Sequence, residues 1–450
     1  MIPFDEKIKK LSRILPEPLY AVGGYVRNFL IDGTISEDVD LAGVMDVEEM
    51  LPFLKKCRLK VVAEYKRTGT FVFFDGKKKY EYAQFRKEIY PEGGFHTPDY
   101  TEKVFTPKED ALRRDFKCNA VYYDIKNGVI VDPLDGLKDI RNKILDTVCD
   151  ANEVFSHDGL RLMRLARFAG ELSFVPTKKV VLAARDNADK IKDIAPERIF
   201  SELKGILASG KKYRFSDGQG SYIGLKILDD TRVLDYIFPE LTLGRGMAQR
   251  SDYHSHDVLE HSLRTALYAE EDVKLYALLH DIGKPFCMLR DGRYRMHGVE
   301  GKRLVKDALK RLKADNKTIK TAQFITENHM LDMEENVRES NLRRFFVKNY
   351  ALLPPLMKVC QADFSGSKDN LSKAPTVKRW EKLLSVMKED GTPFSVADLK
   401  IGAEDIISLG GEGKKIGEIM NVLFDECVIE PQKNNAEKLK KRAENLLKQG

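Results

Sequence analysis

The chain has 450 residues, of which 42% are hydrophobic and 32% are charged, and its net charge is +6. This length is too great for a single hydrophobic core and predicts two to four domains. The mild positive charge permits a nucleic-acid partner without demanding one, and no apolar run approaches the roughly 20 residues of a membrane helix, so we expect no membrane partner.

The first residues of the chain contain no hydrophobic segment that predicts a signal peptide. Six cysteines are scattered without a CxxC pair, which argues against a zinc ribbon or a disulfide framework. Both features predict a protein of the reduced cytoplasm.

Residues 1 to about 140 alternate short β-rich runs with helical patterns. From about 150 the strand patterns nearly vanish, and helical patterns run to the end of the chain. We therefore expect an α+β fold class, with a mixed sheet and helices first and all-α parts after them. Helices are expected at 5–15, 25–30 and 46–56, and strands at 20–24, 38–43, 58–65, 69–76, 78–86, 118–124 and 129–133.

The sequence VGGYVR at 22–27 ends a predicted strand in two glycines and begins a helix that carries an arginine. Backbone N–H groups at Gly23 and Gly24, a helix N-terminus and the guanidinium of Arg27 together suit a phosphate group. We therefore expect a phosphate-binding turn here.

About ten residues later, a predicted strand contains Asp38 and Asp40. Residues i and i+2 of a strand point to the same face, so the two carboxylates should lie side by side. They repel each other unless a cation shares them, and Mg²⁺ is the usual hard cation for carboxylates. A DxD alone also occurs by chance in acidic loops, but after a phosphate-binding turn it predicts nucleotidyl transfer. Glu81 is either a third carboxylate of this site or an outward-facing strand residue.

Two further clusters suit a nucleotide. Arg113, Arg114 and Asp115 offer cations for a triphosphate and a carboxylate for ribose hydroxyls, or they form a surface salt-bridge cluster. Asp158 and Arg161 are i and i+3 on one predicted helix, where the Asp can accept a hydrogen bond from a base and the Arg can donate one. The simpler alternative is an ordinary ion pair within the helix.

A different pattern lies between 254 and 363. Six of the eight histidines fall between 254 and 329, and this clustering is the signal. An adjacent His-Asp pair with distant His and Asp residues can hold one or two divalent metal ions and activate a water for phosphoester hydrolysis. The candidate ligands are His261, His280, Asp281, His297, His329 and Asp363. His254 and His256 equally suit the start of a helix.

The motifs GGYVR, DVDLA, RRDF-x-x-NA, D-P-L-D-G-x-x-D and DGLRLMRLARF follow one another in this order between 23 and 168. Together they resemble the class II tRNA nucleotidyltransferases, the CCA-adding enzymes, and their relatives the bacterial poly(A) polymerases. Residues 254–363 resemble the HD phosphohydrolase superfamily. The resemblance implies a nucleotidyltransferase head at 1–140, a helical neck and RNA-binding region at 141–245, an HD domain at 246–365 and a helical tail at 366–450.

The resemblance also implies roles for individual residues. Asp38 and Asp40 would be the catalytic, Mg²⁺-binding carboxylates. The nucleotide-binding residues would be Gly23, Gly24 and Arg27 for the triphosphate, Arg114, Asp115 and Asn119 for the ribose, and Asp158 and Arg161 for the base, with Arg164 as a further nucleotide-binding residue. In the HD domain, a divalent metal would be held by His261, His280, Asp281 and Asp363, with His297 and His329 completing a second position.

From these roles we expect template-independent addition of CCA to the 3′ end of tRNA from CTP and ATP, with a second, phosphohydrolase activity of the HD domain. The alternatives are CC-only, A-only or poly(A) addition. An alternative of another class is an HD phosphohydrolase whose N-terminal domain only binds nucleotide.

Two positions depart from the family pattern. Asn28 follows the arginine of the glycine segment where Asp is usual, and His157 precedes Asp158 where Glu is usual. Because an imidazolium would repel Arg161, we expect weaker discrimination of C and A at acidic pH. The polar segment 88–110 corresponds to a loop that moves between C and A addition in the family.

Overall fold

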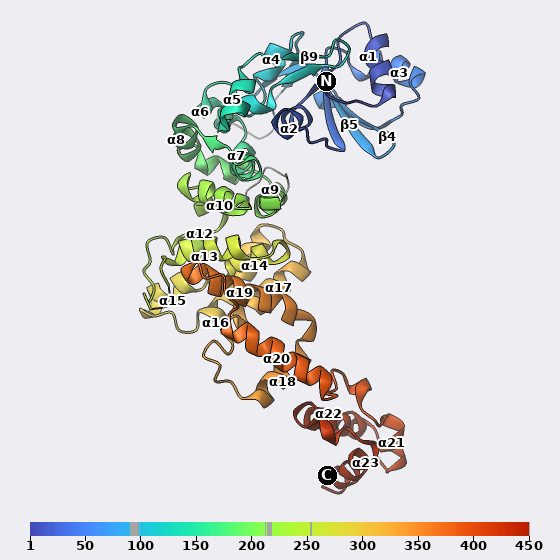
Figure 1. The fold of residues 1–450 in the computed structure, drawn as a ribbon, viewed down its shortest axis with the longest axis vertical. Helices are drawn as coiled ribbons and strands as arrows, with labels where there is room; N and C mark the ends of the chain where they lie inside the picture. Colours follow the sequence, from blue (N-terminus) through green and yellow to red (C-terminus); the bar gives the residue numbers. More distant parts are fainter. Residues whose placement is uncertain (91–97, 99, 212, 214–217, 253, 450) are drawn as a thin grey trace. The chain divides into compact units, whose positions relative to one another are not determined.

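The computed structural model describes residues 1–90, 98, 100–211, 213, 218–252 and 254–449 (Figure 1). The chain forms two compact units, Met1–Thr242 and Leu243–Gly450. The first contains the mixed sheet with its helices, and in the described part of the second every regular element is helical. The predicted α+β fold class followed by all-α parts is therefore confirmed.

Seven strands form the sheet of the first unit in the order β3-β4-β5-β2-β1-β8-β9. Neighbouring strands are antiparallel except β2 and β5, which are parallel. In β2, exposed Asp38 and Asp40 alternate with buried Val39 and Leu41, as expected for a strand with one covered face. The strands are β1 Tyr20–Val22, β2 Asp38–Gly43, β3 Val61–Tyr65, β4 Thr70–Asp75, β5 Lys78–Gln84, β8 Tyr122–Asp124 and β9 Val129–Val131.

The strand predicted at 118–124 starts later than expected. A 3-10 turn, Lys117–Asn119, precedes β8. The side chain of Asp115 accepts hydrogen bonds from the N–H of Phe116 and from the amide of Asn119. Such local side-chain hydrogen bonds compete with extended backbone and fold the turn toward Asp115.

The polar segment 88–110 contains regular structure at both ends. Strand β6 (Arg86–Ile89) pairs with β7 (Tyr100–Lys103), and α4 (Pro107–Ala111) starts with a capping box of Thr106 and Glu109. Within the predicted moving loop 88–110, residues 91–97 and 99 lie outside the described residues.

Helices flank the sheet and continue after it in the first unit. Helix α2 packs against β1 and β2, and α7 packs against α9 and α10 (Figure 1). The apolar residues Leu162, Leu165 and Ala169 of α7 are fully buried in that packing. The helices are α1 Glu6–Ile14, α2 Gly24–Asp32, α3 Val47–Lys56, α5 Gly136–Asn142, α6 Ala151–His157, α7 Leu160–Leu172, α8 Lys178–Asp186, α9 Pro196–Leu207, α10 Gly220–Asp230, α11 Leu234–Ile237 and α12 Pro239–Thr242; the short strands β10 (Ile144–Leu145) and β11 (Val175–Pro176) pair beside them.

In the second unit, α13 packs against α14 and α19, and α16 packs against α17. One core includes Phe346, Leu356 and Trp380, and a separate core near the C-terminus includes Ile406 and Leu423. The helices are α13 Val258–Tyr268, α14 Lys274–Leu279, α15 Lys284–Asp291, α16 His297–Arg311, α17 Asn316–Asn328, α18 Glu339–Lys348, α19 Leu353–Lys368, α20 Pro375–Glu389, α21 Ala403–Ser408, α22 Lys414–Ile429 and α23 Ala436–Gln449. A search of the described helices for one long and apolar enough to cross a bilayer finds none.

Candidate functional site

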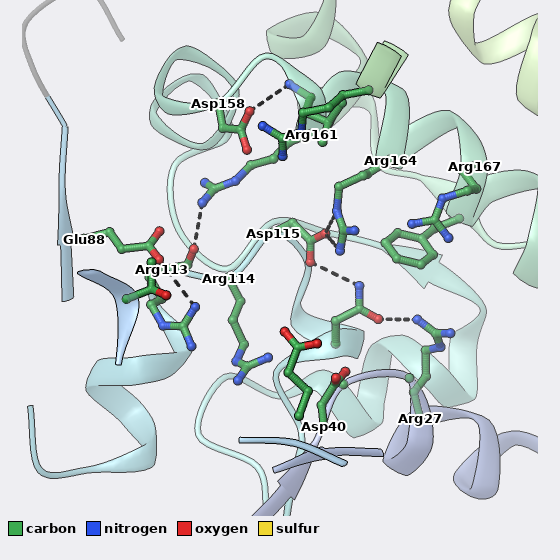
Figure 2. Close-up of a pocket in the computed structure, with 18 of the residues that line it drawn as sticks. Arg27, Asp40, Glu88, Arg113, Arg114, Asp115, Asp158, Arg161, Arg164 and Arg167 are labelled. Atoms are coloured by element: carbon green, nitrogen blue, oxygen red, sulfur yellow. Dashed lines mark hydrogen bonds and ion pairs between the residues drawn. The ribbon is translucent and has the colours of Figure 1, made fainter. Parts of the chain in front are cut away.

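A cavity of about 760 Å³ opens in the first unit and is lined by residues from β2, α2, the segment before β8, and α7 (Figure 2). It brings together ten of the residues that the sequence singled out. They are Gly23, Gly24, Arg27, Asp40, Arg114, Asp115, Asn119, Asp158, Arg161 and Arg164. Asp38 is absent from the lining but lies two residues before Asp40 on the same strand face. Residues remote in sequence therefore form one polar cavity.

The carboxylates lie on two adjacent strands. Asp40 of β2 is paired in register with Glu81 of β5, and Glu81 also lines the cavity, so it faces inward rather than away. Burial and the nearby carboxylates of Glu81 and Asp38 raise the pKa of Asp40. The guanidinium groups of Arg114 and Arg164 lower it, but by less. A divalent cation would remove that repulsion. Because the donors are all carboxylate oxygens, they fit a hard cation of the Mg²⁺ type.

Gly23 allows the start of α2 to lie directly against Asp40. Its φ is +75°, and a Cβ added there would lie 2.8 Å from Oδ2 of Asp40. A side chain would therefore meet both backbone strain and the carboxylate of Asp40.

We expect Gly23→Ala to lower kcat for nucleotide addition about a hundredfold, because a small displacement of a reacting group has an effect of that size. Gly33→Ala is the matched control, since Gly33 ends the same helix with a φ of +80° and has nothing within 4 Å of an added Cβ. Each substitution strains the backbone by about 1–3 kcal/mol, which melting temperatures would report. Equal loss of kcat in both variants would contradict the role of Gly23.

A chain of hydrogen bonds crosses the cavity from α2 to α7 (Figure 2). Arg27 donates to the amide oxygen of Asn119, the Asn119 amide donates to Asp115 at 3.1 Å, and Arg164 donates to Asp115 at 2.8 Å. Burial opposes ionisation of Asp115, but Arg164 and Asn119 outweigh it and hold the pKa at about 2. Asp115 is therefore an anion at every working pH, held in a fixed position.

Phe168 of α7 lies among three of the arginines. The guanidinium carbons of Arg27, Arg164 and Arg167 lie 5.1, 5.0 and 4.4 Å from its ring centroid. The negative face of an aromatic ring attracts such cations and orders them. Arg164 and Arg167 also pair with carboxylates, but among the described residues the hydrogen-bond partners of Arg27 are the amides of Asn28 and Asn119. Among the described residues, no carboxylate pairs with the guanidinium of Arg27, which leaves its positive charge available to an anionic ligand.

Arg113 and Arg114 do not form a surface cluster. They are held by Asp110, a residue to which the sequence analysis assigned no role. Asp110 is fully buried and accepts from Arg113 at 2.7 Å, from Arg114 at 3.1 Å and from the hydroxyl of Tyr122 at 2.7 Å. Its pKa is about 2, because these partners outweigh burial. The available signal was its position three and four residues before the arginines.

Asp158 and Arg161 do not share a helix, contrary to the prediction. Asp158 follows the last residue of α6, Arg161 lies in the first turn of α7, and no ion pair joins them in the described structure. The carboxylate of Asp158 instead accepts from the N–H of Leu160 at 3.0 Å, which breaks the helix between them. Arg161 is buried and donates to the backbone carbonyls of Val154 at 3.2 Å and Arg113 at 2.7 Å (Figure 2). Both side chains nevertheless face the same cavity.

His157, the unusual residue before Asp158, stacks on the ring of Tyr90 with centroids 4.8 Å apart. Burial and the charge of Arg161 lower the pKa of His157, whereas Glu153 raises it. The imidazole is therefore neutral at neutral pH and gains a proton only in more acid solution than an ordinary histidine.

We expect the ratio of CTP to ATP incorporation to change a few-fold in the wild type as the pH falls below about 6.5, the ordinary pKa of histidine. Protonated His157 would then repel Arg161. His157→Glu, measured over the same pH range, should lack this step. Identical pH profiles for the two proteins would rule the effect out.

The second unit brings all six predicted HD residues into one buried cluster. Asp281 lies between two histidine pairs: its Oδ2 is 3.3 Å from His261 and 3.1 Å from His280, and its Oδ1 is 3.2 Å from His297 and 3.4 Å from His329. Asp363 adds an oxygen 3.0 Å from His261. Among the described residues, two sets of three side chains have ligand atoms close enough to share a metal ion, and both sets belong to this cluster.

The ring orientations in this cluster suit metal binding. Nδ1 of His280, His297 and His329 lies 2.7–2.9 Å from a backbone carbonyl, of Ala277, Tyr294 and Thr326 respectively. Each Nδ1 therefore carries a proton, and each Nε2 faces the centre of the cluster, where it offers a lone pair to a metal ion once its own proton is lost. Both oxygens of Asp281 are buried without a hydrogen-bond partner of good geometry. Lone pairs and anions that face one another in this way need cations.

The charge of the cluster supports the same conclusion. Burial lowers the pKa of His280, but Asp281 and Asp363 outweigh burial and raise it to about 10. The buried aspartates thus require a positive charge, which a proton or a metal ion supplies. Gly283 allows the approach of His297, since an added Cβ would lie 2.1 Å from the His297 carbonyl.

Lys284 is a residue of this site that the sequence analysis did not assign. Its ammonium lies 2.6 Å from Oδ2 of Asp281 and donates to Gln249 at 2.8 Å. It also lines a cavity of about 520 Å³ beside Asp363, together with Tyr294 and other residues. The signal was its place three residues after Asp281. The ring of His254 lies against that of His261. Helix α13 begins at Val258 with Asp257 as its N-cap, so His254 and His256 precede it rather than start it.

Three family models match the chain. They are the Poly A polymerase head domain over residues 19–146, the Probable RNA and SrmB-binding site of polymerase A over 173–243, and the HD domain over 253–363.

Curated relatives match over most of their length. An A-adding tRNA nucleotidyltransferase of Deinococcus radiodurans is 31% identical over 341 residues, which cover 71% of this chain and 74% of that protein. A Multifunctional CCA protein of Shewanella frigidimarina is 29% identical over 371 residues, 77% of this chain and 84% of that protein.

Solved structures share the fold. The Bacillus stearothermophilus CCA-adding enzyme in complex with CTP superposes with a TM-score of 0.67 at 21% identity, over 99% of both chains. The Thermotoga maritima CCA-adding enzyme complexed with tRNA gives 0.64 at 18% identity, over 98% of this chain and 96% of that one.

Proposed function

This chain belongs to the family of tRNA nucleotidyltransferases and bacterial poly(A) polymerases, and we propose that it adds C, C and A to the 3′ end of tRNA from CTP and ATP without a nucleic-acid template. The observation that carries this proposal is the single cavity that contains both Asp40 and the base-facing pair Asp158 and Arg161. Reaction centre and base selection are thereby within reach of one nucleotide. The tRNA would bind through phosphate contacts and should dissociate as salt rises.

Asp38 and Asp40, with Glu81 beside them, would hold Mg²⁺. Bound there, Mg²⁺ lowers the pKa of the attacking 3′-hydroxyl and neutralises charge on the triphosphate. Arg27 and the N-terminus of α2 would bind the triphosphate: among the described residues the hydrogen-bond partners of Arg27 are amides rather than carboxylates, and a helix N-terminus offers partial positive charge to a phosphate.

Asp115 would orient the sugar. Its carboxylate is fixed by Arg164 and Asn119, so it can accept a hydrogen bond from the ribose without moving. A deoxyribose would leave part of this polar group unpaired, which disfavours dNTPs.

Asp158 and Arg161 would read the base. Cytosine and adenine both present an exocyclic amino group beside an unprotonated ring nitrogen. Uracil and guanine instead present a carbonyl oxygen beside a protonated ring nitrogen. A carboxylate accepts from the amino group and a guanidinium donates to the ring nitrogen. Because backbone carbonyls hold Arg161, this pattern is built into the junction of α6 and α7.

The alternative activity, addition of A alone, is favoured by one observation: the Deinococcus radiodurans relative is named an A-adding tRNA nucleotidyltransferase. The two activities separate on tRNA transcripts that end before CCA, after C and after CC, each incubated with labelled CTP, ATP or both. Products that end in C-C-A on all three substrates support CCA addition. Extension only of the CC-ended transcript indicates A addition, a long A tail indicates a poly(A) polymerase, and no extension leaves only nucleotide binding.

The HD cluster would hold divalent cations at two positions, with Asp281 between them. His261, His280 and Asp363 would supply one position, and His297 and His329 the other. A divalent cation there supplies an activated water for phosphoester hydrolysis. Lys284 would bind a phosphate oxygen at the mouth of the neighbouring cavity. A cytoplasmic location and the division into head, neck, HD domain and tail at 140, 245 and 365 complete the proposal.

A further inference from the structure

The stack of Tyr90 and His157 joins two parts of the nucleotide cavity that are distant in sequence. The ring planes are 8° from parallel, with centroids 4.8 Å apart. Tyr90 directly follows strand β6, and His157 is the last residue of α6, immediately before Asp158. Parallel aromatic rings at this separation resist sliding and tilting, so the contact restrains both backbones.

Tyr90 is itself held from the other side. Its hydroxyl donates to Glu88 at 2.8 Å, and Glu88 is paired with Arg86 at 2.8 Å and lies 3.6 Å from Arg113. All four residues line the nucleotide cavity and are partly buried. Tyr90 is therefore a fixed support for the histidine ring rather than a freely rotating side chain.

The contacts of Arg161 close this arrangement into a ring. One of its nitrogens donates to the carbonyl of Val154 in α6, and the other donates to the carbonyl of Arg113. Arg113 lies beside Glu88, which accepts a hydrogen bond from Tyr90. Helix α6 ends at His157, which stacks on Tyr90. A shift of the stack would thus displace both Asp158, through the backbone, and Arg161, through its two carbonyl partners.

We infer that the Tyr90–His157 stack is a positioning contact that sets the geometry of Asp158 and Arg161 and so the ratio in which CTP and ATP are used. This inference rests on the proposed function of those two residues. His157 touches neither base nor phosphate in this role, and it acts through its ring rather than its charge.

A double-mutant cycle tests the inference. Tyr90→Leu, His157→Leu and the double variant are assayed at pH 8, with kcat/KM measured separately for CTP and ATP on tRNA transcripts that accept each nucleotide. Each single change should alter the CTP to ATP ratio about three- to tenfold, the range that one aromatic stack contributes. The double variant should alter it no further than either single variant.

Two variants separate the stack from a general structural effect. His157→Phe keeps a ring without a titratable group and should preserve the wild-type ratio, and Tyr90→Phe keeps the ring but loses the bond to Glu88. Should His157→Leu fail to fold, Tyr90→Leu decides, because it removes the same contact from the other side. Asp158→Ala reports on the proposed function: if it leaves the ratio unchanged, that function fails. If Asp158→Ala changes the ratio but the Leu variants do not, or if their effects add, the inference is overturned.

Discussion

Asp40→Asn should lower kcat for nucleotide addition at least about a thousandfold and leave the protein folded. The amide keeps the shape of the side chain but lacks the charge that a divalent cation needs. Metal assistance is worth several kcal/mol, and about 4 kcal/mol corresponds to a factor of a thousand. The measurement is single-turnover extension of tRNA with saturating nucleotide.

The stability of this variant provides a second readout. Glu81 and Asp38 help to raise the pKa of Asp40, so its ionised form is disfavoured in the folded state above the ordinary carboxylate pKa. Removing the charge should therefore leave the melting temperature without Mg²⁺ unchanged or higher. Asp75→Asn, which changes a carboxylate of β4 that pairs with Lys7, is the control and should retain full activity. An active Asp40→Asn enzyme would exclude Asp40 as a catalytic ligand.

Asp281→Asn should abolish divalent metal binding by the second unit. The two oxygens of Asp281 face both histidine pairs, so the substitution would remove a ligand from both positions at once. We expect at least a hundredfold loss of Mn²⁺ affinity and unchanged tRNA extension, because Asp40 lies in the other unit. Titration calorimetry on chelator-treated protein, in an Asp40→Asn background that silences the first site, measures the number of ions bound.

Thermal melts give an independent check. A single bound ion at a hundredfold excess over Kd stabilises a fold by about 2.7 kcal/mol. Mn²⁺ should raise the melting temperature of the wild type and of the control Asp252→Asn, whose exposed carboxylate lines the adjacent cavity. Asp281→Asn should show no such rise. Two ions bound by Asp281→Asn, or only one by the wild type, would refute the two-position arrangement.

The features that local sequence dictates were predictable. The common face of Asp38 and Asp40 follows from the period of a strand, and the turn at Gly23 follows from a glycine pair between strand and helix. The meeting of the six candidate HD residues in one cluster was also predictable, because histidines and aspartates are rare enough on buried helices that their clustering is informative.

The features that tertiary contacts create were not. Asp110 and Lys284 became part of the sites only because folding buried them against arginines and Asp281. The break between α6 and α7 reversed a helical prediction, since the carboxylate of Asp158 accepts a hydrogen bond from the N–H of Leu160. Nothing in the sequence around His157 indicates that its ring meets Tyr90. Such pairings depend on how separate elements approach, which periodicity does not encode.

The ring of Phe168 makes the cavity of the first unit sensitive to substitution at one uncharged position. Three guanidinium groups share that ring: that of Arg27, which we propose binds the triphosphate, that of Arg164, which pairs with Asp115, and that of Arg167, which pairs with Glu202 of α9. A substitution at Phe168 is therefore pleiotropic, whereas a substitution at any one arginine disturbs one function first. The effects of substitutions at the three arginines should consequently depend on one another, because all three side chains contact the same uncharged ring.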